Sequence, residues 1–186
     1  MGNAITEAFR ATPRREFLPD IVVGQATWDV PLPIGFGQTN SQPSTVERML
    51  EWLEVDPGQH ILDVGSGSGW TTALLAHLTG SKGDVVAVEI VPELVEFGRD
   101  NCQWAGVRNV TFHEAGKTLG YPAAAPYDRI LVSAAASELP TALVEQLAPG
   151  GQMVIPVRSD ILVISKDEAG HLDIQTHPGF AFVPLV

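Results

Sequence analysis

A glycine-rich segment lies between a buried-strand pattern and a helical pattern, and its residue types suit a ligand-binding loop. It reads Asp63-Val64-Gly65-Ser66-Gly67-Ser68-Gly69-Trp70. Glycines at such a turn let backbone N–H groups approach a ligand closely, and the start of a helix favours an anion. The dinucleotide fingerprint needs a third glycine where Trp70 stands, and no Gly-Lys-Ser or Gly-Lys-Thr follows as in a P-loop. A different nucleotide-type ligand is predicted, with a plain tight turn as the alternative.

The spacing Asp-x-Gly-x-Gly-x-Gly resembles the first motif of the class I S-adenosylmethionine-dependent methyltransferases. Glu89 ends the following strand pattern, 20 residues after Gly69. A carboxylate at that place can accept hydrogen bonds from both hydroxyls of a ribose. The resemblance implies S-adenosyl-L-methionine as cofactor and S-adenosyl-L-homocysteine as its product. We expect the cofactor to contact Asp63, Gly65, Ser66, Gly67, Gly69, Glu89, Ile90, Ala115 and Gly116.

A second informative stretch, Pro31 to Pro43, reads PLPIGFGQTNSQP. With it the chain resembles the protein-L-isoaspartate (D-aspartate) O-methyltransferase family, in which a PLPIG stretch is followed by Gln-Thr-x-Ser-x-Pro. The likeness continues at 13–19, 125–128, 146–151 and 182–185, and so spans nearly the whole chain. It implies methyl transfer to the free carboxylate of isoaspartyl or D-aspartyl residues in damaged proteins, as the first step of repair.

The same resemblance implies that Ser41 is the active-site residue and that Thr39 helps to shape the catalytic pocket. Contacts with the peptide substrate are expected from Gln38, Asn40, Gln42 and Pro43. Ser41 could instead begin the helix that follows it. However, Ser44 and Glu47 have the spacing of a capping box, which would leave the Ser41 hydroxyl free.

The proposed chemistry agrees with the residue types present. A carboxylate acceptor has a reference pKa near 4, so it is already an ionised nucleophile at neutral pH and needs no general base. The main catalytic task is to align oxygen, carbon and sulfur, and such positioning can contribute several kcal/mol. None of the five histidines shows paired ligand spacing, and we predict no metal site.

Two departures from the family pattern leave alternatives open. Ala115 stands where the family has an aspartate near the adenine amino group, and Glu114 is the nearest substitute. The leading helix is also short, and we expect it to begin only at about Ile5. A class I methyltransferase acting on a small molecule or another acceptor, and a non-catalytic cofactor-binding protein, are therefore alternative functions.

Other polar and aromatic residues near the N-terminus have two interpretations each. Trp28 and Asp29 could contact the peptide substrate, or they could be a packing residue and a turn residue. Arg10, Arg14 and Arg15 could attract an acidic peptide, or they could form an exposed basic turn.

The elements that must position these residues alternate between strands and helices from residue 60 onward, which predicts an α/β class. We expect a Rossmann-like class I methyltransferase fold, with a mostly parallel central sheet, helices on both faces and an antiparallel C-terminal hairpin. The strands are predicted at 60–64, 84–89, 110–113, 128–133, 152–157, 160–165 and 181–183. The helices are predicted at 70–79, 92–104 and 140–147, and residues 149–151 are predicted to form a tight turn.

The N-terminal third is rich in proline and glycine, which disfavour long regular elements. We expect a single methyltransferase domain over 1–186, in which residues 1–45 form an irregular substrate cover and residues 46–186 form the cofactor-binding core. Such a cover over a rigid sheet is a common place for a substrate-binding surface.

The composition restricts the partners. The chain of 186 residues carries 11 basic and 22 acidic side chains, a formal charge of −11, which disfavours nucleic acid and anionic lipid. Cys102 is the only cysteine, which excludes an internal disulfide and fits a reducing compartment. No window suggests a signal peptide or a membrane span. We expect a cytoplasmic monomer whose partners are proteins or peptides that contain isoaspartyl residues.

Overall fold

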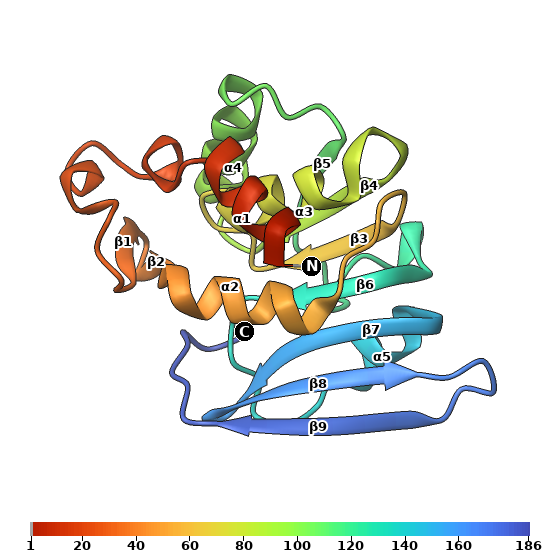
Figure 1. The fold of residues 1–186 in the computed structure, drawn as a ribbon. Coiled ribbons are helices and arrows are strands. Elements are labelled where there is room, and N and C mark those ends of the chain that lie inside the picture. Colours follow the sequence, from red (N-terminus) through yellow and green to blue (C-terminus); the bar gives the residue numbers. More distant parts are fainter. Residues whose placement is uncertain (1) are drawn as a thin grey trace.

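The centre of the molecule is a seven-stranded sheet in the order β5-β4-β3-β6-β7-β8-β9 (Figure 1). The computed structural model describes residues 2–186, with side chains from Ala4 onward. The first five strands in this order are parallel to one another. Strand β8 runs antiparallel to β7, and β9 runs antiparallel to β8. The strands are β3 (His60–Val64), β4 (Asp84–Glu89), β5 (Val110–Glu114), β6 (Tyr127–Val132), β7 (Leu147–Val157), β8 (Asp160–Lys166) and β9 (Leu172–Pro178).

Apolar residues alternate along the strands and form one core on each face of the sheet. One core joins odd-numbered β3 and β4 residues, such as Ile61 and Val85, to side chains of the first four helices. The other joins Leu62 and Val86 to Leu143 and the loop before β6. The helices are α1 (Gly2–Ala11), α2 (Pro43–Leu53), α3 (Trp70–Thr79), α4 (Pro92–Trp104) and α5 (Thr141–Gln146). The predicted fold class is confirmed, with α5 as the single α-helix packed on the second face among the described residues.

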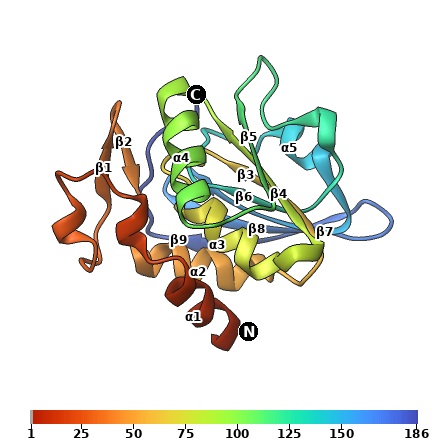
Figure 2. The ribbon, with the colours of Figure 1, turned by 90° about the horizontal axis from the view of Figure 1, so that it is seen from above.

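The N-terminal third is more regular than predicted. Helix α1 begins at Gly2 rather than at about Ile5, and it buries Ile5 and Ala8 against the first core. A small antiparallel sheet, β1 (Leu32–Gly35) with β2 (Gln38–Asn40), lies apart from the main sheet in Figure 2. Glycine fits here because the turn between β1 and β2 needs positive φ angles, as at Gly35 and Gly37. Short 3₁₀ turns occupy Arg14–Phe17, Val23–Gln25, Gly80–Lys82 and Pro122–Ala124.

The C-terminal prediction was partly wrong. The hairpin of β7 and β8 is present and turns at Arg158 and Ser159. The last strand, however, is β9 and not 181–183, because residues 172–178 pair along the whole of β8. The side chains of β9 are mostly exposed, and its apolar alternation is limited to Leu172 and Ile174, which is too short to reveal the strand. Residues 149–151 also belong to β7, where its pairing with β6 is irregular.

Candidate active site

The glycine-rich segment turns between β3 and α3, where the carboxyl ends of the parallel strands meet. The N–H groups of Gly65 and Ser66 donate to the Val88 carbonyl at 2.8 and 3.2 Å, which fixes the loop against β4. Gly67 and Gly69 both have positive φ. A Cβ on Gly69 would stand 2.7 Å from the Gly98 carbonyl oxygen, so this glycine is required for packing against α4.

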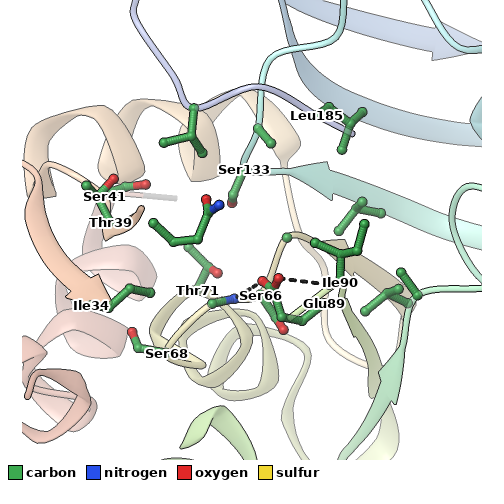
Figure 3. A pocket seen from close by; sticks show the side chains of 18 of the residues that line it. Ile34, Thr39, Ser41, Ser66, Ser68, Thr71, Glu89, Ile90, Ser133 and Leu185 are labelled. Carbon is green, nitrogen blue, oxygen red and sulfur yellow. Dashed lines mark hydrogen bonds between the residues drawn. The ribbon is translucent and has the colours of Figure 1, made fainter. Parts of the chain in front are cut away.

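Glu89 links the end of β4 to this loop. Its side chain is buried, and one carboxylate oxygen accepts the Gly67 N–H at 2.9 Å. The other oxygen accepts the N–H groups of Ile90 and Val91 at 2.8 and 3.1 Å. Each carboxylate oxygen can accept two hydrogen bonds, so the oxygen bonded to Gly67 keeps acceptor capacity. Figure 3 shows Glu89 facing the pocket beside Ile90.

Asp63 lies behind the loop and not in the pocket wall. It is fully buried, and one carboxylate oxygen accepts the hydroxyls of Thr71 and Thr72 at 2.9 and 2.7 Å. The other oxygen has no hydrogen-bond partner among the described residues. Burial raises the pKa of Asp63 to about 6, an effect that the two hydroxyls oppose and that the nearby Glu89 carboxylate reinforces.

A pocket at this end of the sheet brings together most of the predicted site residues. Figure 3 shows Ser41 and Thr39 on one side of it and Glu89 and Ile90 on the other. Of the predicted residues, the pocket is lined by Gln38, Thr39, Asn40, Ser41, Gly65, Ser66, Gly67, Glu89, Ile90 and Ala115. Asp63, Gly69, Gly116, Gln42 and Pro43 do not line it. Among the lining side chains in the described part of the chain, Glu89 is the one that carries a charge.

The segment before α2 is arranged differently from the predicted capping box. Gln42 is the N-cap residue, Pro43 begins the helix, and neither Ser44 nor Glu47 caps it from within. Instead, Asp29 accepts the Ser44 N–H at 2.9 Å, the Ser44 hydroxyl at 2.8 Å and the Gln42 amide at 3.0 Å. Hydrogen bonds from Ser44 and Gln42 lower the pKa of Asp29. Asp29 thus holds the start of α2 in place of the predicted Ser44–Glu47 box.

Arg14 is buried, so it neither attracts an acidic peptide nor belongs to an exposed basic turn, the two interpretations given from sequence. Its guanidinium is buried and donates to the Asn40 side chain at 2.7 Å and to the Ser41 carbonyl at 2.9 Å. The Asn40 amide group also donates to the Ser68 hydroxyl at 3.0 Å. Asn40 lines the pocket, but the described contacts engage both ends of its side chain with the protein.

The far end of the pocket is apolar around Ala115. The side chains of Ile90, Ala115 and Leu119 line it together with Gly120, and Glu114 is exposed. The Ala115 N–H donates to the Glu89 carbonyl at 2.8 Å, which continues the pairing of β4 with β5. Glu114 therefore does not line the pocket in place of the aspartate that the family has at position 115.

Several residues at this site were not predicted from sequence, among them Gly98, Gln146 and Ser133. Gly98 lies in α4 against the loop, and a Cβ there would stand 2.9 Å from the Gly67 carbonyl oxygen. Gln146 of α5 accepts the Tyr121 N–H and donates to the Leu119 carbonyl, both at 2.8 Å, which fixes the wall at Gly120. Ser133 follows β6 and lines the pocket. A glycine inside a helical pattern and a serine at a strand's carboxyl end were the available signals.

Two further features concern metals and membranes. Within residues 2–186, no group of three or more His, Cys, Asp or Glu side chains could hold a metal ion. In the same part of the chain, no helix combines the length and the apolar character needed to cross a bilayer.

Comparison with known proteins gives a consistent picture. The model of the family described as protein-L-isoaspartate(D-aspartate) O-methyltransferase matches residues 1–186. The protein-L-isoaspartate O-methyltransferase of Pyrococcus horikoshii is 46% identical over 190 residues, covering 100% of this chain and 86% of the relative. That of Methanopyrus kandleri is 45% identical over 190 residues, covering 100% and 84%.

Solved structures give the same match. A protein-L-isoaspartate O-methyltransferase structure superposes with a TM-score of 0.90 at 28% identity, over 99% of this chain and 61% of the other. A second structure, from Plasmodium falciparum, is in complex with S-adenosyl-L-homocysteine. It has a TM-score of 0.85 at 25% identity, over 99% of this chain and 90% of the other.

Proposed function

Because the chain belongs to the protein-L-isoaspartate (D-aspartate) O-methyltransferase family, we propose that it transfers a methyl group from S-adenosylmethionine to the free carboxylate of isoaspartyl or D-aspartyl residues in damaged proteins. The methyl ester formed in this way cyclises spontaneously, which begins repair. No observation favours a small-molecule acceptor or a non-catalytic role.

The observation that carries the proposal is the shared pocket of the glycine loop, Glu89, Thr39 and Ser41. It supports a cofactor lying along the loop, with its ribose at Glu89, its base against the apolar wall around Ala115 and its sulfur toward Ser41. The buried Ser66 hydroxyl lines this pocket without a partner among the described residues, so it fits a polar ligand.

The pocket residues perform the transfer by positioning rather than by proton transfer. When bound, the cofactor supplies an electrophilic methyl group on a positively charged sulfur. The Ser41 hydroxyl donates to one oxygen of the substrate carboxylate, and Thr39 limits where that carboxylate can lie. The other carboxylate oxygen then attacks as the carbon–sulfur bond breaks, and the ester and thioether groups formed are neutral. Glu89 is engaged with backbone N–H groups, and its proposed role is to hold the ribose.

We also propose the organisation and setting predicted from sequence. Residues 1–45 serve as the substrate cover and residues 46–186 as the cofactor-binding core of one methyltransferase domain. The packing of Ile5, Ala8 and Phe17 into the same core as α2 and α3 supports one domain. We also propose that the protein is a cytoplasmic monomer without nucleic-acid partners.

The test is transfer of labelled methyl from S-adenosylmethionine to a peptide containing one isoaspartyl residue. The control is the same peptide with a normal aspartyl residue, and binding of S-adenosylhomocysteine is measured by calorimetry. We expect labelling of the isoaspartyl peptide alone, with loss of the label in base as the ester hydrolyses. Cofactor binding without transfer, or equal labelling of both peptides, would contradict the proposal.

A further inference from the structure

Arg14 is a buried cation outside the pocket wall, and we propose that it is a positioning residue for methyl transfer. Arg14 binds the carbonyl oxygen of Ser41 and the side chain of Asn40. Asn40 in turn donates a hydrogen bond to the glycine loop. The inference rests on the proposed function, because it concerns the placing of Ser41 in that reaction.

The guanidinium of Arg14 is saturated with acceptors from two segments of the cover, residues 26–30 and 40–41. Nε donates to Asn40 Oδ1 at 2.7 Å. One terminal nitrogen donates to the carbonyls of Ala26 and Trp28 at 3.5 and 2.9 Å, and the other to those of Val30, Asn40 and Ser41 at 2.8, 3.1 and 2.9 Å. Arginine has five N–H donors in a fixed plane, whereas lysine has three on one nitrogen. A lysine at this position therefore cannot reproduce the arrangement.

This charge is held without an ion pair in the described part of the chain. Asp29 is the nearby anion that favours the charged form, but its oxygens accept from Ser44 and Gln42 instead. Burial lowers the pKa of Arg14 to about 10, so the side chain remains protonated at neutral pH. A buried charge without a counter-ion is costly, and a plain packing role would be served as well by an apolar side chain.

The contact through Asn40 connects the two halves of the active site. Asn40 Nδ2 donates to Ser68 Oγ at 3.0 Å, and Ser68 belongs to the glycine loop on which the cofactor is proposed to lie. A continuous set of hydrogen bonds thus runs from the Ser41 carbonyl through Arg14 and Asn40 to that loop. The set is buried, as Arg14, Asn40 and Ser68 all have exposed fractions of 6% or less.

Loss of this set should affect turnover more than cofactor affinity. The contacts proposed for the ribose and base come from Glu89 and the wall around Ala115, which Arg14 does not touch. The distance between the acceptor carboxylate and the methyl group depends instead on where Ser41 lies relative to the loop. Misplacement by about 1 Å can reduce a rate by about 100-fold.

The experiment compares Arg14→Lys, Ser68→Ala and the matched control Arg15→Lys, since Arg15 is the exposed neighbour in the same 3₁₀ turn. For each we would measure kcat and KM for an isoaspartyl peptide at saturating S-adenosylmethionine, the Kd of S-adenosylhomocysteine and the folded fraction. Per folded molecule, kcat should fall about 10- to 100-fold in Arg14→Lys and about 3- to 10-fold in Ser68→Ala. The Kd should stay within about threefold, and Arg15→Lys should match the wild type.

An unchanged kcat per folded molecule in either Arg14→Lys or Ser68→Ala would overturn the proposal. So would a loss in Arg14→Lys that appears only as a reduced folded fraction. If Arg14→Lys does not fold, Ser68→Ala decides the question, because it removes only the hydroxyl that accepts from Asn40. Failure of the proposed function is a separate result, since the wild type would then bind S-adenosylhomocysteine but methylate no isoaspartyl peptide.

Discussion

Ser41 lines the pocket with its backbone fixed and its side chain free. Its carbonyl oxygen accepts from Arg14 at 2.9 Å, whereas no hydrogen bond of its hydroxyl occurs among the described contacts. A hydroxyl in that condition can donate to a ligand without first losing a bond within the protein. This is the condition expected of a group that orients a substrate carboxylate.

Replacing Ser41 with alanine should therefore lower kcat/KM for an isoaspartyl peptide. Loss of one hydrogen bond to a charged group costs about 1.5–3 kcal/mol, which corresponds to a fall of about 10- to 150-fold. The Kd of S-adenosylhomocysteine should stay within about threefold, since Ser41 is not among its proposed anchors. Methylation kinetics and calorimetry would check both values. Unchanged kinetics in Ser41→Ala would remove Ser41 from the mechanism.

Asp63 leads to a second prediction, which concerns how the stability of the protein depends on pH. Its pKa is about 6 in the folded protein and near 3.8 in a model peptide. Between these values the folded state binds a proton that the unfolded chain does not, so stability falls as pH rises through this window. At pH 7 the buried charge thus costs about 3 kcal/mol, and this cost disappears below about pH 4.

The change Asp63→Asn removes that titration and keeps an acceptor for Thr71 and Thr72. The free energy of unfolding of Asp63→Asn minus that of the wild type should be about 2 kcal/mol more positive at pH 7 than at pH 4. Urea denaturation at four pH values would measure it, with the exposed Asp20→Asn as control. A difference that does not change with pH would show that Asp63 does not titrate in this window.

At the scale of elements, α4 and the glycine loop approach so closely that each needs a glycine. A Cβ on Gly98 would stand 2.9 Å from both the Gly67 carbonyl oxygen and a ring carbon of Phe112. The backbone of α4 therefore packs directly against the glycine loop.

Gly98→Ala should for this reason destabilise the protein, against the direction of helix propensity. Propensity alone favours alanine by about 1 kcal/mol, whereas forced repacking costs about 1–3 kcal/mol. We expect lower stability and at least tenfold weaker binding of S-adenosylhomocysteine, as the loop is displaced. Gln103→Ala, at an exposed position of the same helix, is the control. A more stable Gly98→Ala with normal binding would contradict this account.

Elements with strong local patterns were predictable from the sequence, and those defined by distant partners were not. Strands β3 and β4 and helices α3 and α4 have the predicted bounds, since buried apolar runs and flanking glycine or proline mark them. Strand β9 was missed because only its backbone pairing with β8 defines it. The pocket residues on the glycine loop were predicted from local spacing. The roles of Arg14 and Gln146 could not be predicted in this way. Their hydrogen bonds to Asn40, Ser41, Tyr121 and Leu119 span 25 or more residues of sequence.

At the scale of the whole molecule, the charge of −11 opposes the negative charge of the proposed substrate. Salt screens such repulsion over about 8 Å at physiological ionic strength. Arg14 is buried and cannot attract the peptide, so the substrate carboxylate must be recognised by neutral donors such as Ser41.

Methylation of an acidic isoaspartyl peptide should therefore become modestly faster as salt is added. A basic peptide of the same length, with the isoaspartyl residue in the same place, should become slower, because long-range attraction to the protein is screened. Measurements of kcat/KM at several salt concentrations would check both directions. A steep fall for the acidic peptide would show a positive field at the pocket.

The buried Asn40 has one more consequence, for the chemical ageing of the protein itself. Asn40 precedes Ser41, and an asparagine followed by a small residue can cyclise to a succinimide and reopen as isoaspartate. That reaction expels Nδ2, which here donates to Ser68, and it alters the carbonyl that accepts from Arg14. The hydrogen bonds that hold the active-site segment should therefore also slow the formation at Asn40 of the lesion on which the enzyme is proposed to act.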